Sequence, residues 1–264
     1  MTTLSSRTIG FIGTGAITDA MVRGLLSSPP AVEAVMVSAR NAGIAASLAA
    51  DFPAVTVSQD NQAIVDGCET VVLAIRPQIA EAVVRPLRFR DGQTVISVVA
   101  ATGRPALLDW IGADVHLTQA IPLPFVAQRE GVTAIFPPDG ETAALFAVLG
   151  AAVECETKAE YDLLAAASAL MATYFGIMQQ ATDWLAAKGL PEEKGRAYLA
   201  PLFAGLSGAA LAAGPQMAFT HFTGEFATKG GLNEQVLRDF DEKGGLSALS
   251  LALDRVHRRI TGQE

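Results

Sequence analysis

The sequence predicts an α/β protein, in which a doubly wound parallel sheet is followed by an all-helical C-terminal region. Two observations lead to this prediction. Short apolar runs alternate with helical patterns along the first half of the chain, and helix formers without a β-branched run dominate after Thr157. We therefore expect a first domain over residues 1–157 and a helical second domain over residues 158–264.

The expected strands are short apolar runs, separated by helical patterns such as residues 44–50 and 79–84. This rhythm predicts a parallel sheet whose strands are joined by right-handed crossovers. The second domain is expected to contain one long helix over residues 162–187 and a further helix that begins at Pro191. The expected strands cover residues 8–12, 34–37, 54–57, 70–75, 94–99, 115–119, 132–136 and 152–154.

The composition narrows the classes of function. Half of the 264 residues are apolar, which provides a sizeable core and points to further burial between subunits. The net charge of −8, without a basic stripe, argues against a nucleic-acid partner. Two cysteines, Cys68 and Cys155, are too few for a disulfide framework and lack metal-ligand spacing, so we expect no metal site. Residues 1–6 carry no export signal, and we expect the protein to be cytoplasmic.

One segment has about the length that spans a bilayer. Residues 199–219 are nearly free of charge, but Pro201, Gly214 and Pro215 interrupt them. The alanines and glycines of this segment favour close packing of helices inside a protein. We therefore expect no membrane association.

A G-x-G pair lies between the first expected strand and the first expected helix. Gly13 permits a tight turn there, and Gly15 removes a Cβ atom that would keep a pyrophosphate away from the amide groups at the helix N-terminus. This context favours a dinucleotide site over a plain turn, although Thr18 stands where Gly or Ala is usual. The expected cofactor contacts here are Gly13, Thr14, Gly15, Ala16 and Ile17.

The end of the second expected strand indicates which dinucleotide is bound. An NAD site usually places a carboxylate here, to hold the ribose 2′-hydroxyl, but this chain has Ser38 and Arg40 instead. A hydroxyl and a permanent cation suit a 2′-phosphate better, so the pattern favours NADPH over NADH. The alternative for Arg40 is a solvated residue in a loop.

The end of the fourth expected strand provides further candidate contacts. Ala74, Arg76 and Pro77 follow this strand on the side where open α/β sheets bind their cofactors. The sequence leaves two alternatives for Arg76, which faces either a phosphate or the solvent.

Several segments, taken in order, resemble the pyrroline-5-carboxylate reductase family. Residues 71–78 read V-V-L-A-I-R-P-Q, similar to the family's V-V-L-A-V-K-P-Q with Arg76 in place of Lys. Residues 95–100 resemble its V-I-S-I-A-A, and residues 130–134 resemble its E-G-M-T-A. The resemblance also includes residues 9–15, Ser38, Arg40, Asp162, Ser168, Tyr174, residues 189–191 and residues 230–231, and so covers nearly the whole chain.

The chain departs from the family pattern in three places on the substrate side. The family's P-N-T-P is P-L-P-F at residues 122–125, and its S-G-S-G-P-A-Y is S-A-L-M-A-T-Y at residues 168–174. Its T-S-P-G-G-T-T is A-T-K-G-G-L-N at residues 227–233. The apolar P-L-P-F segment favours a bulkier or less polar substrate than the family's.

The resemblance implies an NADP-dependent oxidoreductase acting on C–N bonds, by default reducing 1-pyrroline-5-carboxylate to proline in amino-acid biosynthesis. It implies a Rossmann-type domain followed by a helical domain that forms the substrate pocket and joins two subunits, as a homodimer or higher homo-oligomer. Thr228 and Asn233 are the candidate catalytic residues, because they replace a family Ser and a Thr thought to face the imine. The candidate substrate-binding residues are Pro122, Leu123, Ser168, Gly230, Gly231 and Leu232.

Alternatives remain for the function of the protein and for the role of the Gly230–Gly231 segment. The altered substrate motifs also fit a related NADP-dependent reductase of a different imine or carbonyl, and the retained cofactor motifs fit a non-catalytic NADP-binding regulator. Backbone amides around Gly230 and Gly231 would cradle a substrate carboxylate, and the alternative is a plain turn between helices.

Overall fold

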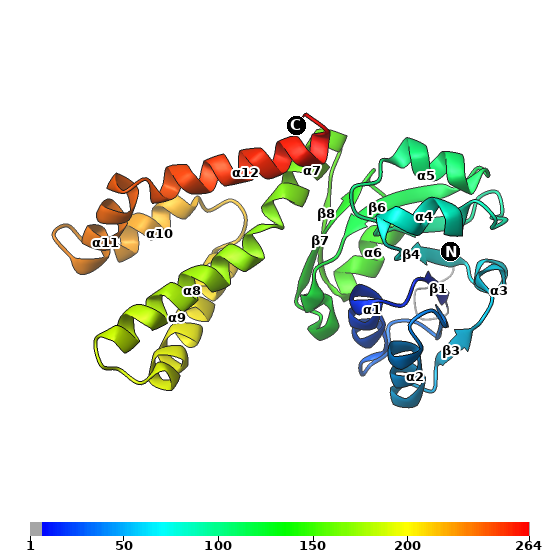
Figure 1. Cartoon of the computed structure of the whole chain (residues 1–264), viewed down its shortest axis with the longest axis horizontal. Helices are drawn as coiled ribbons and strands as arrows, with labels where there is room; N and C mark the ends of the chain where they lie inside the picture. The colour runs from blue at the N-terminus through cyan, green and yellow to red at the C-terminus, as the bar shows by residue number, and fades with distance from the viewer. Residues whose placement is uncertain (1–6, 264) are drawn as a thin grey trace. The chain divides into compact units, whose positions relative to one another are not determined.

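The computed structural model describes residues 7–263. Residues 1–6, for which the sequence predicts no export signal, lie outside the described part. The chain divides into two compact units, Met1–Ala165 and Ala166–Glu264 (Figure 1). This division falls inside helix α7 (Lys158–Ala167).

The first unit contains the predicted sheet. Its strands have the order β3-β2-β1-β4-β5-β6-β7-β8, so the order reverses between β1 and β4. Each strand begins within two residues of the expected position. The strands are β1 (Thr8–Ile12), β2 (Ala34–Ser38), β3 (Val55–Ser58), β4 (Thr70–Leu73), β5 (Thr94–Ser97), β6 (His116–Ile121), β7 (Gly131–Phe136) and β8 (Gly150–Glu154).

One strand differs from the expected all-parallel arrangement. β7 runs antiparallel to β6, with Gln119 opposite Phe136 and Ile121 opposite Ala134, and β8 then runs parallel to β7. The connection from β6 to β7 holds only the short 3₁₀ helix η2 (Pro124–Gln128). A parallel neighbour requires a crossover of a dozen or more residues, so this short connection returns the chain antiparallel.

Helices cover both faces of the sheet and bury a separate cluster on each. One cluster joins α1, α2 and α6 to Ile9, Phe11 and Val72, and the other joins α3, α4 and α5 to Ile12 and Val71. Neighbouring residues of one strand point to opposite faces, which explains why strands buried on both sides are apolar throughout. The helices are α1 (Ala16–Leu26), α2 (Ala42–Asp51), α3 (Asn61–Gly67), α4 (Pro77–Val84), α5 (Arg104–Ile111) and α6 (Gly140–Val148).

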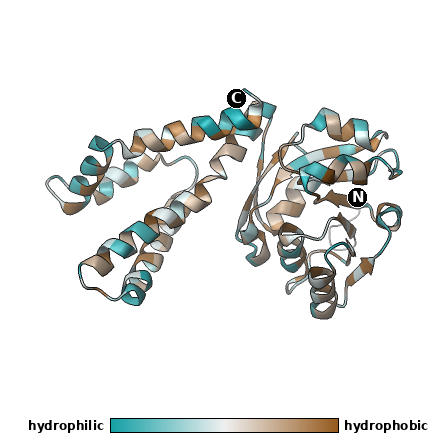
Figure 2. Cartoon of the chain, in the orientation of Figure 1, coloured by the Kyte–Doolittle hydropathy of each residue, from teal (hydrophilic) through white to brown (hydrophobic). Residues whose placement is uncertain are grey.

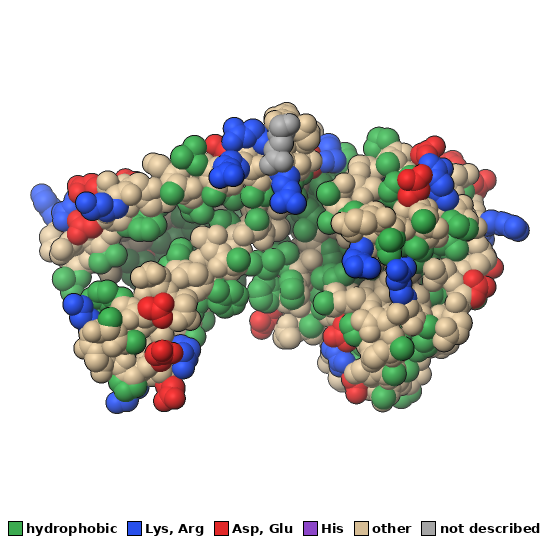
Figure 3. All heavy atoms as spheres, viewed as in Figure 1, with side chains coloured by type: hydrophobic (Ala, Val, Ile, Leu, Met, Phe, Trp, Pro, Cys, Tyr) green, Lys and Arg blue, Asp and Glu red, His purple; other side chains and the backbone are tan. Residues whose placement is uncertain are grey.

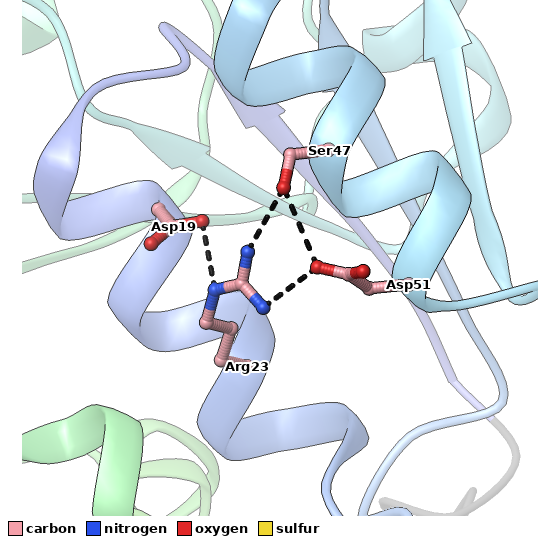
Figure 4. A network of polar contacts seen from close by, with 4 residues as sticks. All are labelled: Asp19, Arg23, Ser47 and Asp51. Atoms are coloured by element: carbon pink, nitrogen blue, oxygen red, sulfur yellow. Dashed lines mark hydrogen bonds and ion pairs between the residues drawn. The ribbon is translucent and has the colours of Figure 1, made fainter.

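A polar network joins α1 to α2 (Figure 4). Arg23 of α1 pairs with Asp19 at 3.0 Å and with Asp51 of α2 at 2.9 Å, and it donates to Ser47 at 3.2 Å. The two helices begin at the ends of β1 and β2, so the network fixes the two chain segments that carry the predicted cofactor contacts.

The second unit consists of helices. The prediction of one helix over residues 162–187 is wrong, because a turn at Ser168 and Ala169 separates α7 from α8. Gly214, with φ +78°, ends α9, so the apolar run 199–219 does not form one continuous helix. The helices are α8 (Leu170–Ala187), α9 (Glu192–Ala213), α10 (Phe219–Phe226), α11 (Leu232–Glu242) and α12 (Gly245–Thr261).

Large apolar side chains of the second unit are exposed in the single chain. Leu211 is 82% exposed, Phe219 77% and Tyr198 69%, and Figures 2 and 3 show apolar residues along these helices. Two helical stretches have the length and apolar composition that a membrane span requires. They are Lys158–Ala187, which contains both α7 and α8, and Glu192–Ala213, and they are weak support for a membrane span.

Candidate cofactor site

A cavity of about 430 Å³ lies at the carboxyl ends of β1, β2 and β4. This is the position where the strand order reverses, and open α/β sheets bind ligands there because the loops on either side separate. The loops after all three strands contribute to it. The lining residues are Gly13, Thr14, Gly15, Arg40, Asn41, Ala42, Ala74, Ile75, Arg76 and Ile79.

The two glycines of the G-x-G pair have different roles. Gly13 has φ +101°, and a Cβ atom there would lie 2.2 Å from the carbonyl oxygen of Ala74, so only glycine fits. Gly15 has an ordinary φ of −103°, and a Cβ atom there would meet nothing within 4 Å. Because Gly15 lines the cavity, its missing Cβ leaves room for a ligand beside the N-terminus of α1.

Three hydroxyl groups hold the glycine loop. Thr18 donates to the carbonyl oxygen of Gly13 at 2.7 Å, so the residue that departs from the usual glycine pattern closes the turn with a hydrogen bond. Ser38 accepts from the amide of Gly13 at 2.9 Å. Thr14 donates to the carbonyl oxygen of Ser38, and its hydroxyl lies 3.1 Å from that of Ser38.

Two arginines supply the positive charge of the cavity. Arg40 follows β2, Arg76 follows β4, and both line the cavity with exposed side chains. Asn41 caps the N-terminus of α2 by accepting from the amide of Ile44 at 3.4 Å. The residues present therefore fit a phosphate-bearing dinucleotide, which requires a close backbone approach at the pyrophosphate and cations at the 2′-phosphate.

Six predicted cofactor residues meet at this cavity, and four do not line it. Ala16, Ile17 and Pro77 begin α1 and α4 just behind the lining residues, and Ser38 is buried beneath the loop. Their contacts with a cofactor stay predictions. The lining also includes Ile75, at the end of the fourth expected strand. Sequence reasoning missed Asn41, Ala42 and Ile79, although an Asn just before a helix is a recognisable N-cap signal. The predicted residues that line the cavity are Gly13, Thr14, Gly15, Arg40, Ala74 and Arg76.

The predicted substrate residues of the first unit lie between β6 and η2. Pro122 and Leu123 are half-buried, and Phe125 on η2 is 45% exposed. Arg129 ends η2 with φ +61° and donates to the carbonyl oxygens of Gly24, Ser27 and Pro29. These three hydrogen bonds offset the strained backbone and fasten η2 to the C-terminal end of α1.

The other predicted substrate and catalytic residues lie in the second unit. Gly230 has φ +76°, and its amide donates to the carboxylate of Glu234 at 2.6 Å. Asn233 donates from its side-chain amide to the carbonyl oxygen of Phe226 at 2.9 Å. Two donors that the sequence predicts for a substrate are therefore engaged within the unit. Sequence reasoning missed Glu234, whose place three residues after the Gly231 N-cap was the available signal.

Two of the remaining predicted residues form the start of α11, and Ser168 lies elsewhere in the chain. Gly231 caps α11, its amide donates to the carbonyl oxygen of Thr228 at 2.8 Å, and Leu232 begins the helix. Ser168 lies in the turn between α7 and α8.

Residues 7–263 also contain side chains of the kinds that form metal sites and reactive cysteines. No group of three His, Cys, Asp or Glu side chains in this part of the chain is arranged to hold a metal ion. Cys68 and Cys155 are free and buried, and burial raises the pKa of the Cys68 thiol to about 11. A thiol with such a raised pKa is not a nucleophile near neutral pH.

Comparison with known proteins agrees with this geometry. A family model described as "NADP oxidoreductase coenzyme F420-dependent" matches residues 8–101, which contain the whole cavity lining. A pyrroline-5-carboxylate reductase of Pseudomonas aeruginosa is 24% identical over 266 residues, covering 97% of this chain and 96% of the relative. The chain resembles the pyrroline-5-carboxylate reductases over almost its whole length. The resemblance inferred from the motifs is therefore confirmed.

Solved structures show the same fold. The 1-pyrroline-5-carboxylate reductase of Streptococcus pyogenes has a TM-score of 0.80 at 20% identity and covers 98% of this chain and 99% of its own. A pyrroline carboxylate reductase of Plasmodium falciparum, described with NADP bound, has a TM-score of 0.79 at 14% identity, with 98% of each chain covered. The predicted Rossmann-type sheet and helical C-terminal region are confirmed. The family model also supports NADP as the cofactor.

Proposed function

We propose that the protein reduces a cyclic imine with NADPH, and that its default substrate is 1-pyrroline-5-carboxylate, which becomes proline. The observation that carries this proposal is the cavity at the β1–β4 reversal, which has glycine backbone on one side and two arginines on its lining. The match to an NADP oxidoreductase model and to curated pyrroline-5-carboxylate reductases supports an NAD(P)-dependent oxidoreductase.

Bound NADPH supplies the hydride, so the residues of this chain only have to bind, orient and exclude water. The backbone of Thr14 and Gly15 binds the pyrophosphate at the start of α1. Arg40 binds the 2′-phosphate, and Arg76 adds a second cation on the cavity lining. Pro122 and Leu123, fastened through η2 and Arg129, form an apolar boundary after β6.

No strong acid is required for this reaction. An imine nitrogen is basic enough to be partly protonated near neutral pH, and its carbon then accepts hydride readily. Thr228 and Asn233 are proposed to orient the imine by hydrogen bonding. Thr228 precedes α11 and Asn233 lies in its first turn, which supports this role. The Asn233 amide nitrogen already donates to Phe226, so the side-chain oxygen of Asn233 is the group proposed to face the imine.

A second candidate substrate is an imine without a carboxylate. Glu234 already holds the Gly230 amide at 2.6 Å, and its negative charge opposes a substrate carboxylate at the same turn. The apolar side chains of Leu123 and Phe125 favour a less polar substrate as well. This observation supports a relative of the reductases that acts on a different imine.

One assay separates these candidates. NADPH oxidation is followed by absorbance with 1-pyrroline-5-carboxylate and with 1-pyrroline, the same ring without the carboxylate. Preferred turnover of the carboxylate substrate supports the default, and preferred turnover of 1-pyrroline supports the second candidate. NADPH binding without turnover of either compound would favour a non-catalytic regulator.

Two variants test which side chain binds the 2′-phosphate and which one opposes a substrate carboxylate. Arg40→Ala should weaken NADPH binding at least about tenfold more than NADH binding, because only NADPH carries the 2′-phosphate. Glu234→Gln keeps an acceptor for the Gly230 amide but removes the charge. If the carboxylate substrate binds at this turn, Glu234→Gln should lower its KM and leave that of 1-pyrroline unchanged.

We also propose that the second unit forms a homodimer. Large apolar side chains on α8, α9 and α10 are exposed in the single chain, and Trp184 is 59% exposed. Apolar surface of this extent marks an interface in proteins that remain in solution. Analytical ultracentrifugation should give twice the chain mass, and a monomer at micromolar concentration would contradict the proposal.

A further inference from the structure

We propose that Ser38 is a positioning residue, which holds the glycine loop in its binding conformation and does not contact the 2′-phosphate. This inference rests on the proposed binding of NADP. It assigns the discrimination between NADP and NAD to Arg40, although Ser38 ends β2, Arg40 lies two residues further on, and both are candidate phosphate contacts from the sequence.

The first argument is a count of protons. Each hydroxyl group has one proton to donate. Thr14 uses its proton on the carbonyl oxygen of Ser38. The two hydroxyl oxygens lie 3.1 Å apart, and because the Thr14 proton is already used, a hydrogen bond between them uses the proton of Ser38. Ser38 therefore donates to Thr14 and has no proton left for a phosphate.

The second argument concerns acceptors. Ser38 accepts a hydrogen bond from the Gly13 amide at 2.9 Å. A phosphate oxygen is itself an acceptor and is repelled by a hydroxyl oxygen whose proton points elsewhere. Ser38 and Thr14 are each only 4% exposed, and Ser38 is not among the residues that line the cavity.

The third argument is what this hydrogen-bonded ring holds in place. Gly13 has φ +101°, one of several conformations open to glycine, so hydrogen bonds to its amide and carbonyl groups select this one. Ser38 fixes the amide of Gly13, and Thr18 fixes its carbonyl oxygen. Thr14 and Gly15, the next residues along, line the cavity, so the ring determines where their backbone lies.

The experiment is a titration of the full-length protein with NADPH and with NADH, followed by nicotinamide fluorescence. The variants are Ser38→Ala, Thr14→Val, the double variant and Arg40→Ala. Ser38→Ala should raise the Kd of NADPH and that of NADH by the same factor, about tenfold. The ratio of the two Kd values should therefore stay within about twofold of that in the parent protein. Arg40→Ala should change that ratio at least about tenfold.

The double variant tests the ring itself. Because Ser38 and Thr14 act as one unit, removing both hydroxyls should cost little more affinity than removing the more harmful one alone. Ser27→Ala, which removes a hydroxyl that donates to the Gly24 carbonyl oxygen at the other end of α1, is the matched control and should bind both cofactors as the parent does. Thr14→Val retains the volume of the side chain, so it remains informative if Ser38→Ala does not fold.

Three results would overturn the inference. Loss of NADPH affinity at least fivefold greater than loss of NADH affinity in Ser38→Ala would make Ser38 a phosphate ligand. A lower melting temperature with unchanged Kd values would make its role purely structural. A parent protein that binds neither cofactor would instead refute the proposed function, and this result is seen before any variant is measured.

Discussion

The two units of this protein bury their apolar residues in different ways. The first unit has apolar clusters on both faces of its sheet, and Phe11, Met21 and Phe146 are fully buried in one of them. The second unit has almost no core of its own. Its buried residues within the described chain are Ala166, Thr182, Gly195 and Leu199.

This difference shows that the two halves depend on different interactions for stability. A sheet covered by helices on both faces removes enough apolar surface from water to fold as one chain. The helices of the second unit leave residues such as Leu211 and Phe219 exposed in the single chain, and the proposed dimer would cover such residues. The contrast agrees with a first unit that binds the cofactor and a second unit that assembles subunits.

The largest expected effect is a loss of stability when a glycine of the tightly packed first unit is replaced. Gly13→Ala places a Cβ atom 2.2 Å from the Ala74 carbonyl at φ +101°, so the loop must move, and we expect about 4 kcal/mol of lost stability. Gly230→Ala in the second unit has φ +76° but open space, so its cost should be about 1 kcal/mol. Urea unfolding of both variants measures the difference. Equal losses would show that the crowding at Gly13 is relieved without cost.

The next effect tests the exposed surface of the second unit. Tyr198, Leu202 and Leu206 lie on one face of α9 and are exposed in the single chain. The double variant Leu202→Lys, Leu206→Lys should dissociate the dimer at micromolar concentration and lower its stability by about 2 kcal/mol. Glu193→Lys, an exposed position on the opposite side of the same helix, is the control and should remain dimeric. Sedimentation equilibrium gives both masses, and an unchanged dimer would mean that this face is not the interface.

A smaller effect separates binding from folding within the first unit. Gly15→Ala adds a Cβ atom with no neighbour within 4 Å at an ordinary φ, so the melting temperature should stay within about 2 °C. The same Cβ atom projects into space that a pyrophosphate requires, so NADPH affinity should fall about tenfold. Calorimetric titration measures the affinity. Unchanged NADPH binding would place the pyrophosphate elsewhere.

The smallest expected effect is the difference in stability that one ion pair contributes in each unit. Arg7 lowers the pKa of Glu141 through a bidentate contact at 2.8 and 2.9 Å, although Glu141 is half exposed. A lowered folded pKa stabilises the protein above the unfolded pKa of about 4.3, and this contribution disappears as the pH falls through the folded value.

Its size should be about 1 kcal/mol or less, because the solvent screens the exposed carboxylate. Glu141→Gln should remove this part of the stability at pH 7 and flatten the dependence on pH between about 5 and 3. Glu192→Gln removes an exposed pair with Arg196 in the second unit and should change the stability by less than about 0.5 kcal/mol. Urea midpoints of both variants at pH 7 and at about pH 3 measure the losses. Equal effects of the two variants would contradict a larger contribution from the Arg7–Glu141 pair.

Local sequence patterns were enough to predict the fold class, most strand positions, the cavity-lining glycines and the preference for a phosphate-bearing cofactor. These features depend on residues that are close together in the chain. Apolar runs bounded by glycine indicate buried strands, and Arg40 with no carboxylate at the end of β2 favours a 2′-phosphate over a free 2′-hydroxyl. The resemblance to a family rested on the same short segments.

Hydrogen bonds between groups far apart in the chain could not be predicted in this way, because they depend on how the strands and loops are assembled. Ser38 and Gly13 are 25 residues apart, and their hydrogen bond exists because β1 and β2 are neighbours in the sheet. The antiparallel return of β7 and the contact of Glu234 with Gly230 likewise depend on the path of the backbone. A sequence shows which side chains have protons to donate, and the assembled backbone decides which acceptors receive them.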